Sequence, residues 1–443
     1  MTSGDGRPDA GTENARASAG EGLETVDITA LAAGGEGVGT LASGKVVFVP
    51  RTAPGDRVRV RVERERARWA RARLEVLEQP GPERIEPPCP LYDRCGGCQL
   101  QHLAYEAQVR WKGRFVADAL ARIGGVGEHA VEVHPAPRPF EYRTRVRFTL
   151  RRLPGGRVVA GFHQLGRPAR LVDVDDTCLL PTPALRRAWG EVRAAWGEGA
   201  RLLPAGRSLE LTLREVEEGP VLLVEGGEGP GRPDRILAGA PSLAAVWMRP
   251  RGGPAVHAAG APTITERRGG ARLAVGPATF VQVNAEAAAA LEDAVVKALG
   301  PVDGRRVVDA YAGAGLLARR LAAAGATVVA IEREPDAVRA ALAAAPSGLV
   351  VAEGSVEERL PGALPADAVV LNPPRAGIAP EVAEALRAAP SPTLVYVSCD
   401  PATLARDLER LAATYDIVSV SAYDLFPQTA HVETLAVLTA RSD

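Results

Sequence analysis

The chain has 443 residues, of which 46% are hydrophobic and 24% are charged. These proportions are typical of globular proteins and exclude a wholly disordered chain, and the length suggests about three domains. No run of about 18 apolar residues occurs, which excludes a membrane span. The first 22 residues lack the apolar core of a secretory signal, so we expect a cytoplasmic protein. Because the formal net charge is only −1, a nucleic-acid partner would be recognised by local clusters of basic residues.

The N-terminal part predicts a disordered tail followed by a small β-barrel. Residues 1–22 are polar and show no periodicity, as expected for disorder. Residues 24–79 contain short apolar runs separated by glycines. Within them, residues 57–62 alternate strictly between Arg and Val, which places Arg on one face of a strand and Val on the other. Several prolines from Pro80 onward mark the end of this domain.

The central region, residues 80–279, mixes helical and strand patterns and predicts an α+β domain. Residues 142–148 again alternate with Arg on one face of a strand. Residues 57–73 hold eight Arg and two Glu, a local charge of +6, and residues 138–152 hold six Arg and one Glu, a local charge of +5. Such runs are often only solvated faces. In a neutral protein, however, rows of guanidinium groups favour contact with phosphates.

The cysteines indicate a metal centre. Cys89, Cys95 and Cys98 lie within ten residues, and Cys178 supplies a fourth thiol. In a large cytosolic chain this pattern indicates metal or redox chemistry, since disulfide frameworks belong to small secreted proteins. Four thiolates bind structural zinc, which the spacing alone favours. The fifth cysteine, Cys399, requires a separate explanation.

From about residue 280 short apolar strands alternate with helical patterns, which predicts a parallel sheet with a ligand at the carboxyl ends of its strands. The first strand leads into Gly313 and Gly315, where the backbone could approach a ligand closely, although such turns are often only tight connections. The next strand ends at Glu332, placed to accept hydrogen bonds from a ribose diol. Ala318 stands where a dinucleotide fold has its third glycine, which suits S-adenosylmethionine because that cofactor has no pyrophosphate.

A third strand of this pattern ends in a rigid loop. Residues 368–371 run into Asn372, Pro373 and Pro374, which makes Asn372 a candidate ligand contact. Asn-Pro-Pro followed by an aromatic residue is typical of enzymes that methylate exocyclic amines, where the aromatic ring stacks on the flipped base. Arg375 holds that position here. Methylation of an exocyclic amine therefore remains an alternative function, although the aromatic residue that would stack on the base is absent at this position.

Cys399 follows the apolar strand 393–397, and Pro401 begins a helix just after it. A buried, inert thiol is the commoner state of a free cysteine. The helix N-terminus, however, would stabilise a thiolate, and a free thiol is only about 3% ionised at pH 7. We therefore interpret Cys399 as a nucleophile. Near the C-terminus, His431 and Glu433 are expected on one face of a strand, for which a solvated edge strand is the alternative.

Four segments carry a family resemblance. They are Cys-Pro-Leu-Tyr-Asp-Arg-Cys-Gly-Gly-Cys-Gln-Leu-Gln-His (89–102), Phe-Val-Gln-Val-Asn (280–284), Ser-Cys-Asp-Pro (398–401) and Phe-Pro-Gln-Thr-Ala-His-Val-Glu (426–433). Together they resemble the RNA uracil-C5 methyltransferases, most closely the iron–sulfur-containing bacterial 23S rRNA branch, over residues 24–443. The N-terminal barrel resembles a TRAM domain, an RNA-binding β-barrel. The resemblance implies a multidomain α/β protein: a TRAM/OB-like barrel (24–79), an α+β central domain with the cysteine cluster (80–279) and a Rossmann-like class I methyltransferase domain (280–443).

The resemblance also implies a reaction. Cys399 would add to C6 of a flipped uridine, C5 would take the methyl group of S-adenosylmethionine, and Glu433 would remove the C5 proton. The cofactor-binding residues implied are Gln282, Tyr311, Glu332 and Asn372, beside the turn glycines Gly313 and Gly315. The metal ligands implied are Cys89, Cys95, Cys98 and Cys178, and the resemblance favours a 4Fe–4S cluster over zinc.

The expected partner is RNA, with 23S rRNA favoured over transfer RNA, and we expect a monomer without membrane contact. Two positions depart from the family pattern: Asn372 replaces the usual Asp, and Leu316 stands where Asn is often found. Both leave the details of cofactor contact open without changing the reaction class. A non-catalytic RNA-binding factor that uses the barrel and the Arg rows is a further alternative, and it predicts RNA binding without methyl transfer.

Overall fold

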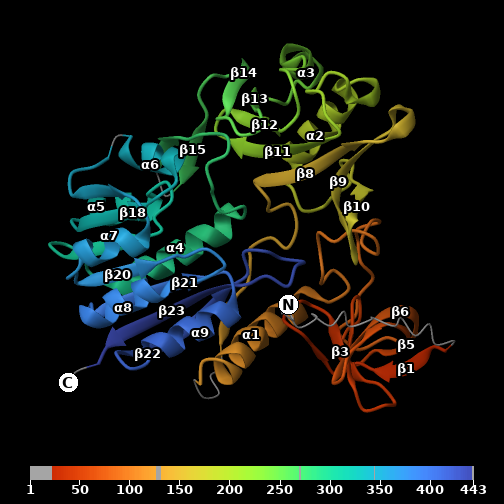
Figure 1. The fold of residues 1–443 in the computed structure, drawn as a ribbon, viewed down its shortest axis with the longest axis horizontal. Coiled ribbons are helices and arrows are strands. Elements are labelled where there is room, and N and C mark those ends of the chain that lie inside the picture. The colour runs from red at the N-terminus through yellow and green to blue at the C-terminus, as the bar shows by residue number, and fades with distance from the viewer. Residues whose placement is uncertain (1–21, 126–130, 269–270, 344, 442–443) are drawn as a thin grey trace, which may run out of the picture. The chain divides into compact units, whose positions relative to one another are not determined.

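The computed structural model describes residues 22–125, 131–268, 271–343 and 345–441. The chain divides into two compact units, one ending at Arg84 and the other beginning at Ile85, whose elements are labelled in Figure 1. The disordered tail expected at residues 1–22 lies outside the described residues except for Gly22. Among the helices of the described residues, none has the length and apolar character that crossing a bilayer requires.

The first unit is a six-stranded sheet around its own apolar core, with the strand order β1-β5-β6-β4-β3-β2. Its strands are β1 Glu24–Asp27, β2 Ala30–Leu31, β3 Gly37–Thr40, β4 Val46–Val49, β5 Arg57–Glu65 and β6 Trp69–Gln79. Along β5, Val58 and Val60 are buried whereas Arg57 and Arg59 are exposed, as the alternation predicted. Each inward Val contributes roughly 1.5–3 kcal/mol by leaving water, so this unit has a core of its own.

The second unit contains two large sheets. One has seven strands in the order β10-β9-β8-β11-β12-β13-β14. Its elements are β8 Arg145–Arg152, β9 Val158–Gln164, β10 Arg167–Asp173, β11 Ser208–Val216, β12 Gly219–Glu225, β13 Ala245–Arg249 and β14 Val256–Gly260, with α2 Pro183–Ala195, α3 Pro233–Gly239 and the short helical turns Pro154–Gly156 and Glu198–Ala200. A hairpin of β15 Thr265–Arg268 and β16 Ala271–Ala274 follows.

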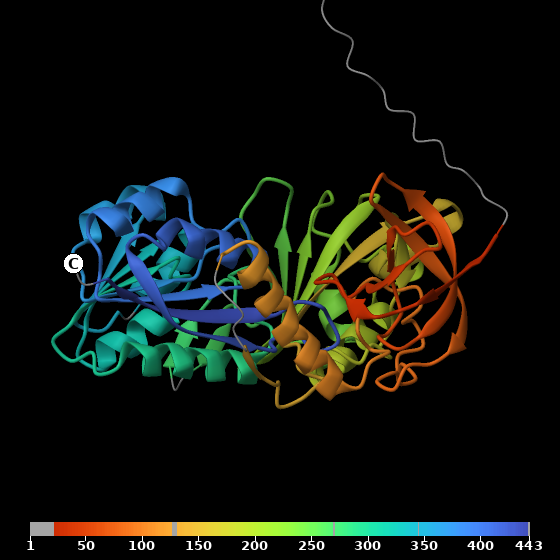
Figure 2. The same ribbon diagram turned by 90° about the horizontal axis from the view of Figure 1, so that it is seen from below.

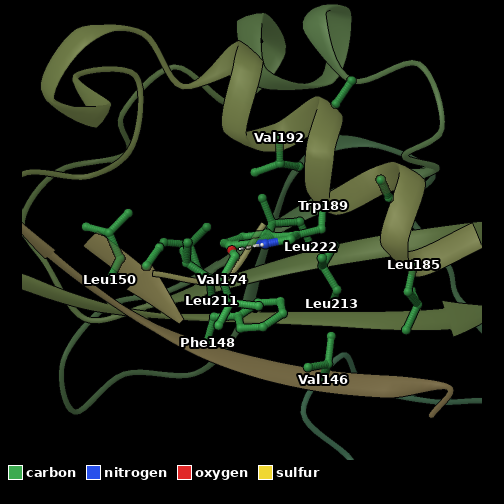
Figure 3. Close-up of a cluster of buried hydrophobic side chains, with 14 of the residues drawn as sticks. Val146, Phe148, Leu150, Val174, Leu185, Trp189, Val192, Leu211, Leu213 and Leu222 are labelled. Carbon is green, nitrogen blue, oxygen red and sulfur yellow. Dashed lines mark hydrogen bonds between the residues drawn. The ribbon is translucent and has the colours of Figure 1, made fainter. Parts of the chain in front are cut away.

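One face of the seven-stranded sheet packs against α2 (Figure 3). The rings of Phe148 on β8 and Trp189 on α2 stack with their centroids 4.2 Å apart. The indole nitrogen of Trp189 donates a hydrogen bond of 2.8 Å to the carbonyl oxygen of Val174, so its one buried polar atom is satisfied. This aromatic core joins the helix to the sheet.

The other large sheet has eight strands in the order β19-β18-β17-β20-β21-β23-β22-β7. Its main strands are β17 Arg306–Ala310, β18 Thr327–Glu332, β19 Leu349–Glu353, β20 Ala368–Leu371, β21 Thr393–Ser398, β22 Tyr415–Tyr423 and β23 Glu433–Ala440, and its helices are α4 Ala285–Leu299, α5 Leu316–Ala323, α6 Pro335–Leu342, α7 Val356–Ala363, α8 Pro380–Ala388 and α9 Pro401–Leu411. The strands from β17 to β21 are parallel. Helices cover both faces of the sheet (Figure 2), so the predicted fold class is confirmed.

Two elements from the middle of the chain are built into this second sheet. The strand β7 Glu132–His134 pairs in parallel with β22. The helix α1 Tyr105–Arg122 packs against α9, where Val116 and Leu120 share an apolar cluster with Leu404 and Leu408. Part of the region expected in the central domain therefore supports the methyltransferase sheet.

Candidate active site

A cavity of about 840 Å³ opens at the carboxyl ends of β17, β18, β20 and β21. This is where a parallel sheet was expected to bind its ligand. Seven of the eight residues predicted for cofactor binding and catalysis line it, namely Gln282, Tyr311, Gly313, Glu332, Asn372, Cys399 and Glu433. The eighth, Gly315, lies behind the lining and caps α5. One cavity thus collects residues spread over about 150 positions of the chain.

The turn after β17 has an unusual backbone. Tyr311, Gly313 and Gly315 have φ angles of 64°, 56° and 73°, in the left-handed region that favours glycine. A side chain on Gly315 would lie 3.1 Å from the Cβ of Ala341, whereas Gly313 faces open space in the cavity. The strained conformation of Tyr311, which is not a glycine, is typical of ligand sites. The turn therefore exposes backbone to a bound molecule.

The carboxylate of Glu332, at the end of β18, organises this turn. Its Oε2 accepts a hydrogen bond of 2.8 Å from the backbone N–H of Gly313, and its Oε1 accepts from the N–H groups of Arg333 and Glu334 at 2.8 and 2.7 Å. A carboxylate has about four acceptor positions, so Oε2 retains one for a hydroxyl. The arrangement fits the predicted contact with a ribose diol and fixes the glycine turn at the same time.

Sequence reasoning missed Asp309 on β17. Its side chain is 3% exposed and lines the cavity, and its Oδ2 has no hydrogen-bond partner among the described residues. Burial, with the charges of Glu292 and Glu332, raises the pKa of Asp309 to about 7, although a hydrogen bond with the backbone of Ala318 opposes the rise. A buried carboxyl oxygen without a partner costs folding energy unless a ligand pairs with it. The signal in the sequence was an acidic residue inside an otherwise apolar strand.

The predicted nucleophile and base lie at the adjacent ends of two neighbouring strands. The last residue pair of the antiparallel strands β21 and β23 is Ser398 with Thr434. Cys399 is the next residue of the chain after β21, and Glu433, the first residue of β23, is the residue before Thr434. Both side chains line the same cavity, and the charge of Glu433 acts on the Cys399 thiol.

The protonation states of this pair are coupled. Glu433 is 2% exposed, and burial raises its pKa to about 7, although the charge of Arg375 opposes the rise. Burial also raises the pKa of the Cys399 thiol, the charge of Glu433 raises it further, and Arg375 lowers it. A negative charge on one group thus disfavours a negative charge on the other. Arg375, which sequence analysis treated only as a missing stacking partner, is the cation that acts on both.

The expectation that the helix N-terminus lowers the thiol pKa is wrong for the free protein. The N-cap of α9 is Asp400, whose carboxylate accepts a hydrogen bond of 2.8 Å from the N–H of Thr403. This carboxylate places a negative charge at the helix start and contributes to the raised pKa of Cys399. Burial and the two neighbouring carboxylates therefore outweigh the helix dipole.

The prediction of a strand through His431 is also wrong. β23 begins at Glu433, and His431 lies in the preceding loop, which contains Gln428 with a φ of 70°. β23 runs between β21 and β22 and is largely buried, so it is not a solvated edge strand. The imidazole of His431 lies at the cavity edge-on to Phe426, with ring centroids 5.9 Å apart. Burial lowers its pKa, as do the charges of Arg375 and Lys112.

The four clustered cysteines line a second, buried cavity. Its walls also include apolar residues, namely Leu91, Tyr92, Phe162, Val174, Leu179 and Leu180. Burial raises the pKa of Cys98 to about 12 and that of Cys178 to about 11. Among the described residues, no three Cys, His, Asp or Glu side chains are close enough together to hold a single metal ion. The four predicted ligands therefore lie together in one cavity.

Half of the arginines predicted to face phosphates are paired with carboxylates. In the barrel, Arg57, Arg59, Arg61 and Arg71 form ion pairs with Asp27, Glu78, Glu75 and Glu36. On β8, Arg147 pairs with Glu210 and Glu225, and Arg152 donates to backbone carbonyls. Neighbouring strands bring acidic side chains that a local charge count does not include, so the positive charge of these rows is lower than the count indicates, and their contact with phosphates stays a prediction. Arg66 and Arg68, in the turn between β5 and β6, are exposed and form no ion pair with any described residue.

Comparison with known proteins agrees with this architecture. Residues 23–74 match the TRAM domain model, and residues 363–441 match the model of the tRNA (uracil-5-)-methyltransferase family. The chain is 35% identical to the 23S rRNA (uracil(1939)-C(5))-methyltransferase RlmD of Chromohalobacter salexigens, over 94% of this chain and 89% of that one. It is 36% identical to an uncharacterized RNA methyltransferase of Thermosynechococcus vestitus, over 93% and 97% of the two chains.

A solved structure extends the similarity to the fold. The tRNA (uracil-54, C5)-methyltransferase of Pyrococcus abyssi, in complex with S-adenosyl-L-homocysteine, aligns with a TM-score of 0.72 and 26% sequence identity, over 94% of this chain and 100% of that one. The resemblance drawn from the four motifs is confirmed. The chain therefore belongs to the RNA uracil-C5 methyltransferase family and is an S-adenosylmethionine-dependent enzyme with an N-terminal TRAM domain.

Proposed function

We propose that this protein methylates C5 of one uridine in 23S rRNA through a covalent bond between Cys399 and the base. The observation that carries the proposal is the placement of Cys399 and Glu433 at adjacent strand ends in the cavity that also contains the glycine turn and Glu332. A uracil ring between them would present C6 to the thiol and C5 to the carboxylate. Exocyclic-amine methylation requires neither residue.

The reaction follows from the weak nucleophilicity of uracil C5. The Cys399 thiolate adds to C6, which gives C5 enolate character. When bound, S-adenosylmethionine would supply an electrophilic methyl group. C5 would take this group as its bond to the sulfonium sulfur breaks, and S-adenosylhomocysteine would be the leaving group. Glu433 then accepts the C5 proton, the electrons of that C–H bond form the C5–C6 double bond, and the sulfur leaves as a thiolate. Gln282, Tyr311, Glu332 and Asn372 would hold the cofactor beside the base, with Gly313 and Gly315 shaping the turn.

The electrostatics of the cavity suit these steps. A general base works best with a pKa near the operating pH, and Glu433 has a pKa of about 7. A neutral Glu433 removes the charge that opposes thiolate formation at Cys399, while Arg375 favours the thiolate. The cycle can therefore begin with a neutral Glu433 and an ionised Cys399. The same carboxyl, once ionised, is the base that ends it.

The choice of 23S rRNA rests on the relatives. The RlmD proteins of Chromohalobacter salexigens and Pseudomonas putida are 35% and 34% identical to this chain and are named for 23S rRNA. The Pyrococcus abyssi enzyme named for tRNA is 26% identical.

Ribosomal RNA as substrate also implies a location in the cytoplasm. In the barrel, Arg66 and Arg68 beside Trp69 form the basic and aromatic site that would contact RNA there.

The test of this function uses two variants and mass-spectrometric mapping of 5-methyluridine in ribosomal and transfer RNA from cells with and without the gene. Loss of one methyl group from 23S rRNA is expected. Cys399→Ala should abolish methyl transfer and form no adduct. Glu433→Gln should slow turnover by about 10²–10⁴-fold and accumulate a protein–RNA complex that survives denaturation. An active Cys399→Ala protein would favour amine methylation, and an unchanged methylation profile would contradict the rRNA substrate.

The four cysteines Cys89, Cys95, Cys98 and Cys178 would hold a 4Fe–4S cluster. All four line one largely apolar cavity, as four thiolates that hold one cluster must, and the four motifs resemble the iron–sulfur branch of the family. A side chain at Gly96 would lie 2.9 Å from the carbonyl oxygen of His163, so this glycine is required where the cysteine loop packs on β9. When bound, the cluster would take up the negative charge of four thiolates and link the loop to Cys178.

Metal analysis tests this assignment. Protein purified without oxygen should contain about four iron and four sulfide ions per chain. Its solution should show a broad absorption band in the visible spectrum, and exposure to oxygen should remove that band. Cys178→Ser should lower the iron content while leaving S-adenosylmethionine binding, measured by calorimetry, unchanged. One zinc ion per chain and no iron would contradict the cluster and restore the assignment that spacing alone favoured.

A further inference from the structure

The segment between β22 and β23 delivers two cavity residues without having regular secondary structure. It runs from Asp424 to Val432, and Glu433 follows as the first residue of β23. Phe426 and His431 from this loop line the active cavity, whereas Gln428 does not and is 3% exposed. Gln428 also has a φ of 70°, which a side-chain-bearing residue adopts only when its surroundings hold it there. The contacts of Gln428 therefore decide how the chain enters β23.

Gln428 has hydrogen bonds to three other parts of the second unit. Its carbonyl oxygen accepts bonds of 2.9 Å from the N–H groups of both Gln99 and Leu100, the residues that follow Cys98. Its N–H donates to Oε1 of Gln108 on α1 at 3.0 Å, and its Oε1 accepts from Nε2 of Gln108 at 3.0 Å. Its own Nε2 donates to the carbonyl oxygen of Pro139 at 3.3 Å. Gln108 is 1% exposed, so this reciprocal amide pair is buried.

Two further contacts hold the loop from the same side. The buried ammonium of Lys112, one turn of α1 after Gln108, lies 2.5 Å from Asp424 and donates to the carbonyl oxygen of Phe426 at 3.0 Å. The hydroxyl of Tyr142 donates to the carbonyl oxygen of Pro427 at 3.0 Å. All of these partners lie between residues 99 and 142, outside the predicted methyltransferase domain. The base is thus held in place from another part of the chain.

We propose that Gln428, through its hydrogen bonds with Gln108 and the segment after Cys98, is a positioning residue for proton abstraction by Glu433. The proposal rests on the proposed function, since it assigns Glu433 the role of base. Gln428 does not line the active cavity, where the nucleobase and the cofactor would bind, and it acts by fixing the loop that leads into β23. Cys399 lies in the loop between β21 and α9, to which no hydrogen bond of Gln428 runs among the described residues.

Loss of the Gln428 hydrogen bonds should therefore affect only the last part of the catalytic cycle. Addition of Cys399 to C6 and uptake of the methyl group at C5 come before Glu433 accepts the proton. A displaced Glu433 therefore leaves these two steps intact and slows removal of the C5 proton, formation of the C5–C6 double bond and release of the thiolate. The covalent intermediate accumulates. A defect that merely loosened the fold would slow all steps together.

The experiment compares natural RNA with RNA containing 5-fluorouridine at the target. Fluorine cannot leave as a cation, so that RNA stops at the methylated adduct and reports the steps before proton removal. Gln428→Leu and Gln108→Leu should each lower turnover on natural RNA by up to about 100-fold, the loss expected for a displacement near 1 Å. Both should leave the rate of adduct formation with 5-fluorouridine RNA and the KM for S-adenosylmethionine unchanged, and the double variant should lose no more than either single variant.

Tyr415→Phe is the matched control. It removes a buried hydrogen bond from the N–H of Ser391 at the end of the sheet opposite Cys399, so it should lower the melting temperature without changing either rate. Gln428→Glu, which keeps the chain length and an acceptor, replaces Gln428→Leu if that variant does not fold. Equal loss of turnover and adduct formation, or no loss of turnover, overturns the proposal. Failure of the unmodified enzyme to form any adduct would instead overturn the proposed function.

Discussion

At the scale of single residues, the cavity contains two carboxyl groups whose burial opposes the ionised form that the chemistry requires. Glu433 and Asp309 are nearly fully buried, and burial raises the pKa of each to about 7. A buried carboxyl group that is partly neutral at physiological pH destabilises the fold when it ionises. Such sites are kept because the chemistry requires them, so removing the charge should stabilise the protein while inactivating it.

Glu433→Gln should change the pH dependence of stability. Because the folded pKa of Glu433 is raised, its proton stabilises the folded state at low pH, and this stabilisation is lost as pH rises from about 4.5 to 7. Gln mimics the protonated form. The variant should match the parent protein near pH 5 and exceed its free energy of unfolding by on the order of 3 kcal/mol near pH 8. Urea unfolding at both pH values measures the difference.

Glu409→Gln, on the exposed face of α9, is the control for loss of a carboxylate and should change stability little at either pH. A Glu433→Gln protein that is less stable than its parent at pH 8 would mean that the carboxylate is a structural partner and that its pKa is not raised. Asp309 acts in the same direction, so its contribution persists in the variant and does not alter the sign.

At the scale of elements, the sequence predicts those helices and strands whose caps and apolar periodicity lie within their own residues. Asn284 caps α4 and a proline begins α8, so both helices start at signals that the local sequence carries. α7 and β19 were missed, since α7 contains a proline and β19 is only partly buried. β7 was missed as well. Three residues at a sheet edge carry no periodic signal, and their pairing with β22 is a long-range choice.

The candidate site divides in the same way. Cys399 directly follows β21 and Glu433 begins β23, so their placement at the cavity follows from local patterns combined with the family motifs. The network behind them does not, because Lys112 and Asp424 are 312 residues apart and Gln108 and Gln428 are 320 apart. Each of these polar residues looks unremarkable in its own segment. Only the folded chain shows that they satisfy one another's buried polar groups.

At the scale of the whole molecule, the charge of a surface depends on which strands the fold brings together, and the charge count of one segment does not predict it. The barrel sheet sets acidic side chains of β1 and β6 against the arginines of β5, which leaves the turn between β5 and β6 as the exposed basic site of that sheet. Its partner should therefore contact the turn. Surface ion pairs of this kind contribute little to stability but remove the paired arginines from phosphate binding.

Arg66→Ala combined with Arg68→Ala should weaken RNA binding and flatten its salt dependence. Each lost phosphate contact lowers the slope of log K against log salt by roughly 1. Filter binding of the rRNA fragment across a range of salt concentrations measures this slope. The matched control, Arg57→Ala with Arg59→Ala, removes the same charge from arginines paired with Asp27 and Glu78 and should leave the slope close to that of the parent protein. Equal effects of the two double variants would refute the turn as the contact site.

The strand β7 makes residues 280–443 depend on an earlier part of the chain. Glu132–His134 pairs with β22 from a position about 170 residues before β17. A protein truncated to residues 280–443 would therefore expose the backbone of β22 at the edge of the sheet, where another chain could pair with it. A truncated enzyme that is to stay soluble must include α1 and β7.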